Sequence, residues 1–129
     1  MTGRFVIVDN DAVNNLLCTL AIRDAAGEVE IQTFELPVKA FEYLTADINI
    51  ENITVLFLDI NMPIWSAWDF LNNFEKLEEK IKSKIKIYLL SSSIDANDKH
   101  RATENKNVVE YIEKPLSVNT VSSILTKWM

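Results

Sequence analysis

Short runs of β-forming apolar residues alternate along the chain with longer stretches in which apolar residues recur every three or four positions. This alternation predicts an α/β fold, in which helices cover a parallel sheet. Five runs have the length and composition of strands: Arg4–Val8, Val29–Phe34, Val55–Leu58, Ile85–Leu90 and Val108–Ile112. Of these, Val55–Leu58 is apolar throughout, as a strand buried on both faces requires, whereas the alternation around Glu30 is typical of an edge strand.

The stretches between the strands predict amphipathic helices. One stripe of apolar residues at helical spacing consists of Val13, Leu16, Leu17 and Leu20. A second stripe runs from Phe70 to Ile81, behind a capping sequence that begins at Ser66. Pro37 fits the first turn of a short helix through Leu44.

Two further helices are predicted in the second half of the chain. The segment from Asp95 to Lys106 is almost entirely polar apart from two alanines. Its helix is therefore expected to be the least firmly packed one. A last helix starts near Ser117 and carries an apolar stripe that ends at Trp128.

Length and composition narrow the classes of function. A chain of 129 residues is the size of one domain, and we expect a single domain over residues 1–129. Two glycines exclude the glycine-rich phosphate loops, and one cysteine with one histidine excludes a disulfide or a Cys/His zinc site. The net charge of −6 argues against a direct nucleic-acid partner. No apolar run is long enough for a membrane span, so a cytoplasmic protein without a membrane partner is expected.

Polar residues follow the predicted strands in a pattern that indicates chemistry. Ligand groups in open parallel sheets gather beyond the carboxyl ends of the strands. The residues at these positions are Asp9, Asn10 and Asp11; Asp59 and Asn61; Ser91, Ser92 and Ser93; and Lys114. Two carboxylates ~4 Å apart repel by about 4 kcal/mol at an effective dielectric near 20, so Asp9 and Asp59 require a cation or a raised pKa. Oxygen ligands suit Mg²⁺, and Lys114 and Ser91 could contact a phosphoryl group, so the set predicts an aspartyl-phosphate site.

Four motifs in this order resemble the receiver domain of two-component response regulators, the CheY-like family. They are Val6–Asp11, Leu56–Pro63, Leu89–Ser92 and Tyr111–Pro115, and the likeness extends over the whole chain. The resemblance implies a three-layer, doubly wound, flavodoxin-like (βα)5 fold whose five parallel strands have the order 2-1-3-4-5. It also implies a phosphoacceptor in signalling rather than an enzyme, with at most self-catalysed phosphorylation and dephosphorylation.

The resemblance assigns roles to particular residues. Asp59 would accept the phosphoryl group from a sensor histidine kinase, a phosphotransfer protein or a small phosphodonor. The cofactor Mg²⁺ would be held by Asp9, Asn10, Asp59 and the backbone carbonyl of Asn61. Ser91 would be the switch hydroxyl, Tyr111 the aromatic residue that reports its movement, and Lys114 a contact to the phosphoryl oxygens through a loop with a cis Lys114–Pro115 bond. Because the chain ends after the last predicted helix, we expect a stand-alone receiver whose downstream target is a protein that binds the last two helices and the fifth strand.

Other interpretations of the same residues stay open. Asp9 to Asp11 could be only a strand end and a helix cap, and Tyr111 could be a half-buried strand aromatic. The family usually has an acid at Asn10 and a glycine at Ala67, so a degenerate receiver that binds partners without phosphorylation is an alternative. Asp9 to Val13 also matches the nucleophile motif of haloacid-dehalogenase-type phosphatases, although no acidic pair follows Lys114. In that case Asp9 would be the nucleophile.

Overall fold

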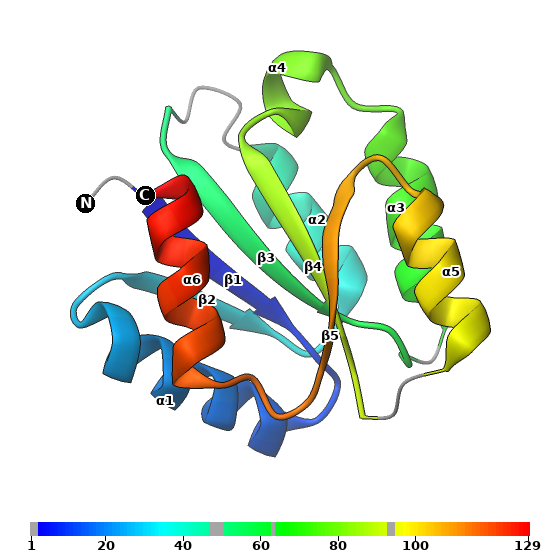
Figure 1. Ribbon diagram of the computed structural model, residues 1–129. Helices are drawn as coiled ribbons and strands as arrows, with labels where there is room; N and C mark the ends of the chain where they lie inside the picture. The colour runs from blue at the N-terminus through cyan, green and yellow to red at the C-terminus, as the bar shows by residue number, and fades with distance from the viewer. Residues whose placement is uncertain (1–2, 47–50, 63, 93–94) are drawn as a thin grey trace.

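A parallel sheet forms the middle layer of the molecule. The computed structural model describes residues 3–46, 51–62, 64–92 and 95–129. Within these residues, five strands have the order β2-β1-β3-β4-β5, and every neighbouring pair is parallel (Figure 1). The strands are β1 (Gly3–Val8), β2 (Glu30–Phe34), β3 (Ile53–Asp59), β4 (Ile85–Ser91) and β5 (Val108–Glu113). The predicted fold class and strand order are therefore confirmed.

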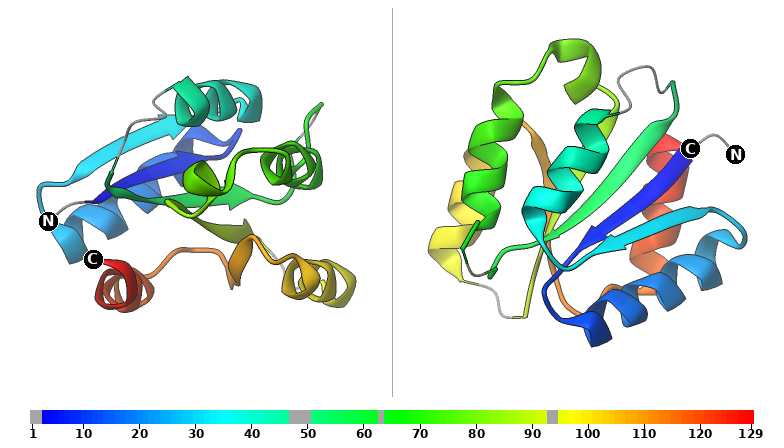
Figure 2. Two further views of the ribbon diagram at one scale, coloured as in Figure 1. Left: turned by 90° about the horizontal axis from the view of Figure 1, so that it is seen from above. Right: turned by 180° about the vertical axis from the view of Figure 1, so that it is seen from behind.

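Helices cover both faces of the sheet (Figure 2). Those of the described residues are α1 (Ala12–Ala26), α2 (Pro37–Ala46), α3 (Ala67–Glu75), α4 (Glu79–Lys82), α5 (Ala96–Glu104) and α6 (Val118–Trp128). Helices α1 and α6 pack on one face in a core cluster that includes Ile22 and Val121. The opposite cluster takes Leu44 from α2, Phe70 from α3 and Ala102 from α5. No described helix has the length and apolarity that crossing a lipid bilayer would need.

The central strands supply both cores by alternation. In β3, Val55 and Phe57 point into the cluster under α1 and α6, whereas Leu56 and Leu58 point into the cluster under α2, α3 and α5. All four side chains are fully buried. A strand whose side chains pack into a core on each face of the sheet has no polar face, which explains the continuous apolar run of β3. Strand β2 lies at the edge of the sheet, as its alternating sequence predicts.

The second predicted helix is divided in two. Helix α3 ends at Glu75, and α4 begins only at Glu79, whereas the apolar spacing predicts one helix through Ile81. The turn between them brings the Lys82 ammonium back to 2.8 Å from the Glu75 carboxylate. This reversal also directs the chain toward the start of β4 at Ile85.

Helix α1 is rotated relative to the orientation that its apolar stripe suggests. The stripe of Val13, Leu16, Leu17 and Leu20 is 49% to 63% exposed. The helix instead buries Asn14, Asn15, Cys18, Ala21 and Ile22. The physical reason lies in the first turn, where the amides of Asn14 and Asn15 donate hydrogen bonds to Asp9 and so fix which face meets the sheet.

Candidate functional site

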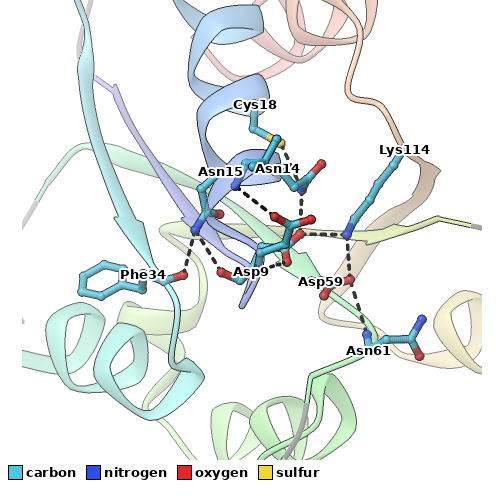
Figure 3. Close-up of polar contacts among 10 residues, drawn as sticks. Asp9, Asn14, Asn15, Cys18, Phe34, Asp59, Asn61 and Lys114 are labelled. Carbon is cyan, nitrogen blue, oxygen red and sulfur yellow. Dashed lines mark hydrogen bonds and ion pairs between the residues drawn. The ribbon is translucent and has the colours of Figure 1, made fainter.

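Three charged side chains meet at the carboxyl edge of the sheet. Asp9 directly follows β1, Asp59 is the last residue of β3, and Lys114 directly follows β5. Figure 3 shows the two carboxylates pointing toward the Lys114 ammonium from neighbouring strand ends. Asp9 is 1% exposed and Asp59 is 4% exposed. The structure therefore brings together the three residues on which the predicted site depends.

Lys114 bridges the two carboxylates. Its Nζ lies 2.7 Å from Asp9 Oδ2 and 3.1 Å from Asp59 Oδ1. The backbone N–H of Lys114 donates to the carbonyl of Ser91 at 2.7 Å, which ties the start of this loop to the end of β4. The Lys114–Pro115 peptide bond is cis, as the family resemblance implies. The ammonium is thus anchored from its backbone and from both carboxylates.

The site holds more negative charge than its own cation balances. Burial raises the pKa of the Asp59 carboxyl, the Asp9 charge raises it further, and Lys114 opposes both effects. Burial alone would lower the pKa of Lys114, but the hydrogen bonds and charges of Asp9 and Asp59 outweigh burial and raise it. Lys114 therefore stays protonated. A second cation at this edge would relieve the repulsion that remains between the carboxylates.

Two asparagines that the sequence analysis did not single out support Asp9. Asn14 Nδ2 donates to Asp9 Oδ2 at 2.6 Å, and Asn15 Nδ2 donates to the Asp9 carbonyl at 2.9 Å. The backbone N–H of Asp11 donates to Asp9 Oδ1 at 2.8 Å. Asp9 is thus held by donors from the first turn of α1. The available signal was two adjacent polar residues in the otherwise apolar first two turns of the helix.

Cys18 lies one turn further along the buried face of α1. Its sulfur is 3.7 Å from Asn14 Nδ2, and the residue is 1% exposed. Burial, together with the nearby Asp9 charge, raises the pKa of the thiol to about 11. The thiol is therefore protonated at neutral pH and belongs to the packing of α1.

The other predicted site residues surround this cluster at different depths. The Asn61 N–H donates to Asp59 Oδ1 at 3.4 Å, and Ser91, the buried last residue of β4, lies on the strand next to Asp59. Asn10 is exposed to solvent. Tyr111 is half-buried on β5, where it lines a cavity against α5. Among the described residues, no group of three or more His, Cys, Asp or Glu side chains is placed to hold a metal.

The loop after Asp59 has an unusual backbone at Ile64, and not at Ala67, where the family usually has a glycine. Ala67 is the first residue of α3, whereas Ile64 has φ of 68°, in the region that β-branched residues rarely adopt. Ile64 is also 98% exposed. Trp65 packs edge-on against Phe41 and Phe70, with ring centroids 5.6 Å and 5.9 Å away, so its indole fills a hydrophobic cluster between α2 and α3.

A family comparison agrees with this arrangement. The model of the response regulator receiver domain matches residues 5–126. The chain belongs to the family of receiver domains of two-component response regulators. Receiver domains of this family serve as signalling phosphoacceptors and interact with histidine kinases and downstream effectors. No curated protein is significantly similar to the chain.

Solved structures share the whole fold. A two-component response regulator from Cytophaga hutchinsonii is 28% identical, with a TM-score of 0.88, and the match covers 98% of this chain and 96% of that one. A response regulator receiver protein from Dyadobacter fermentans is 23% identical, with a TM-score of 0.87 and coverage of 98% and 97%. The phosphorylated cyanobacterial phytochrome response regulator is 20% identical, with a TM-score of 0.76 and coverage of 97% and 92%.

Proposed function

We propose that this receiver takes a phosphoryl group on Asp59 in a Mg²⁺-dependent reaction and that the adduct switches a protein-binding face. The observation that carries the proposal is the pair of buried carboxylates, Asp9 and Asp59, held against the one ammonium of Lys114. A buried charge lowers the stability of a protein unless it is paired with an opposite charge. Two carboxylates that are kept buried against a single ammonium therefore indicate a functional role. The phosphodonor is a sensor histidine kinase or a phosphotransfer protein.

The donor set fits a divalent cation with hard oxygen ligands. Asp9 and Asp59 supply carboxylates, and the Asn61 carbonyl and the Asn10 side chain supply neutral oxygens. Burial, and after it the charge of Asp9, raises the pKa of Asp59, and a bound cation would stabilise the ionised carboxylate against both effects. When bound, Mg²⁺ neutralises charge on the phosphoryl oxygens. With Asn10 in place of an acid, the affinity for Mg²⁺ is lower than that of a site with three carboxylates.

The chain's own residues orient the reaction. Asp59 Oδ1 accepts hydrogen bonds from Lys114 and from the Asn61 N–H, so Oδ2 is the oxygen that attacks phosphorus. The new O–P bond forms as the bond from phosphorus to the donor imidazole nitrogen, or to the acetate oxygen of acetyl phosphate, breaks. The leaving group takes that electron pair. Lys114 then balances the charge of one phosphoryl oxygen, and the Ser91 hydroxyl donates to another.

The exposed stripe on α1 is the proposed docking surface for the phosphodonor protein. Helix α1 starts three residues after Asp9, so a protein that delivers phosphate to Asp59 must cover the first turns of α1. Val13, Leu16, Leu17 and Leu20 are apolar and about half exposed there. A contiguous apolar patch of this kind marks an interaction site. We assign it to an apolar helical surface of the donor.

Mass spectrometry of the intact protein tests phosphorylation directly. Incubation with acetyl phosphate and Mg²⁺ is expected to add the mass of one phosphoryl group to the wild type and none to Asp59→Asn. Asp11→Asn is the matched control, because Asp11 is an exposed carboxylate at the same edge, and it should be labelled like the wild type. Omitting Mg²⁺ or adding a chelator should abolish labelling.

Two results would overturn the proposal. A wild type that binds no Mg²⁺ at millimolar concentration and forms no adduct is a degenerate receiver. Turnover of a generic phosphate ester that is lost in Asp9→Asn and kept in Asp59→Asn would make Asp9 the nucleophile, as in haloacid-dehalogenase-type phosphatases.

A further inference from the structure

Helix α5 is held to the rest of the molecule by few buried side chains. Of its nine residues, Ala102 is the buried one, as the polar sequence of this segment predicts. A cavity of about 290 Å³ lies between α5 and β5, and it is lined by Lys99, Ala102, Thr103, Val108, Val109, Glu110 and Tyr111. An element with so little buried apolar area opens more easily than the core.

One contact joins α5 to the neighbouring helix α3. The guanidinium carbon of Arg101 lies 4.2 Å from the centroid of the Trp68 ring. Trp68 is half-buried and packs against the core cluster on this face of the sheet. The stack therefore ties an exposed residue of a weakly packed helix to a fixed aromatic ring. Such a cation–π contact is favourable even when partly exposed.

The position of the stack connects it to the candidate site. Trp68 lies in the first turn of α3, the helix that follows the loop after Asp59. Arg101 lies on α5, the helix that follows Ser91 at the end of β4. Strands β3 and β4 are neighbours in the sheet, and α3 and α5 lie side by side beyond them (Figures 1 and 2). The stack thus joins the two helices that leave the two strands carrying Asp59 and Ser91.

We propose that the Arg101–Trp68 stack is a latch that sets how often α5 opens from β5. While the ring and the guanidinium are in contact, α5 closes over the cavity beside Tyr111. When the contact is lost, the buried part of α5 is still only the small side chain of Ala102, so the helix opens more often and the cavity becomes accessible to a partner. This device goes beyond phosphorylation of Asp59, because it regulates α5 in the unmodified protein as well.

A coupling to the candidate site follows from the placement of the latch and rests on the proposed function. A phosphoryl group at Asp59 accepts a hydrogen bond from the Ser91 hydroxyl. Ser91 lies four residues before the N-cap of α5 at Asp95. A shift at this point moves α5 relative to Trp68. Phosphorylation is therefore expected to weaken the stack and to raise the opening rate of α5.

Hydrogen exchange of the full chain, without Mg²⁺ or phosphodonor, tests the latch. Arg101→Ala and Trp68→Leu are each expected to speed amide exchange in residues 98–104 by roughly three-fold to ten-fold, with β1 and β3 unchanged. The double variant should be no faster than either single variant, because one contact has been removed in all three. Asn97→Ala is the matched control, since Asn97 is an exposed polar residue on the same helix and is not among the residues that line the cavity, and it should exchange like the wild type.

The latch and its coupling to phosphorylation can each be refuted separately. The latch is refuted if Arg101→Ala exchanges like Asn97→Ala, or if the effects of Arg101→Ala and Trp68→Leu multiply in the double variant. For the coupling, the wild type is then phosphorylated with acetyl phosphate and Mg²⁺, and its mass is checked. Faster exchange of α5 in the wild type but not in Arg101→Ala supports the coupling, and equal acceleration in both refutes it. If no adduct forms, the proposed function and the coupling both fail. The exchange rates of the unphosphorylated variants still show whether the latch exists.

Discussion

Helices α1 and α5 place their apolar and polar residues in opposite ways. Helix α1 turns Asn14 and Asn15 inward and leaves its leucines half exposed, whereas α5 is polar outside and buries a single alanine. Helix α1 is nonetheless the better anchored of the two, because its first turn is hydrogen-bonded to Asp9. Which residues of a helix are buried therefore depends on the groups that the helix contacts at the sheet, and not on its apolar stripe alone.

The largest expected effect concerns the outer face of α1. Replacing Leu16 and Leu17 together by serine should reduce phosphotransfer from a phosphotransfer domain that labels the wild type by roughly ten-fold or more, because the donor loses apolar contact area. Labelling by acetyl phosphate should be unchanged, since this small donor needs no docking surface. Stability should fall by only about 1 kcal/mol for each residue, because half of each side chain is already exposed, as measured by urea unfolding.

The corresponding control lies on α5. Lys99→Ser changes an exposed residue that is far along the chain from the α1 stripe, and transfer should stay at the wild-type level. If the leucine variant transfers normally, or if it loses several kcal/mol of stability, the description of α1 as an outward-facing docking helix is wrong.

A matched pair of helix caps sharpens the comparison. Asp11 caps α1 by accepting from the Val13 N–H, and Asp95 caps α5 by accepting from the N–H groups of Asn97 and Asp98. Asp11→Ala should lower the free energy of unfolding by about 1 kcal/mol. Asp95→Ala should lower the global free energy of unfolding by less than Asp11→Ala does, because the loss cannot exceed the free energy that holds α5 closed. Its effect should instead appear as faster amide exchange confined to α5, and equal global losses in the two variants would contradict the comparison.

The smallest effect concerns the segment that follows α5. Hydrogen bonds from Lys82 and from Asn107, just before β5, lower the pKa of Glu75 to about 2. A depressed pKa gives stability that is present above the unfolded value, near 4.5, and is lost as the pH falls toward about 2. Glu75→Gln should therefore melt at a lower temperature than the wild type at pH 7, and the difference should shrink below pH 4.5. Glu42→Gln, in an exposed pair with Lys39, should melt like the wild type throughout, and a difference for Glu75→Gln that persists at pH 2 would refute the assignment.

Most of the fold could be predicted because side chains of the central strands pack into two cores, one on each face of the sheet. Val55 to Leu58 must be continuously apolar to do so, and the alternation around Glu30 marked the edge strand in the same way. The rotation of α1 could not be predicted from the stripe, because hydrogen bonds to Asp9 set it. The break after Glu75 was also missed, since the lysines and glutamates around it suit either one helix or two.

The candidate site was predicted to the extent that strand ends determine it. Parallel strands bring Asp9, Asp59 and Lys114 to one edge, and the two ion pairs follow from that topology. Asn14 and Asn15 were missed because they lie inside a helix, where an apolar stripe appeared to define the inner face. Asn10, Ser91 and Tyr111 keep their proposed roles as predictions, because their function depends on ligands and on movement rather than on which strand carries them.

The state of Cys18 has a practical consequence for following these motions. The chain has a single cysteine, and its buried thiol stays protonated at neutral pH. Because maleimides react with thiolates, the native residue will be slow to modify, and a cysteine introduced on α5 or on the outer face of α1 can be labelled selectively. Spin labels or fluorophores at those positions can then report the separation of the two helices without first removing the natural thiol.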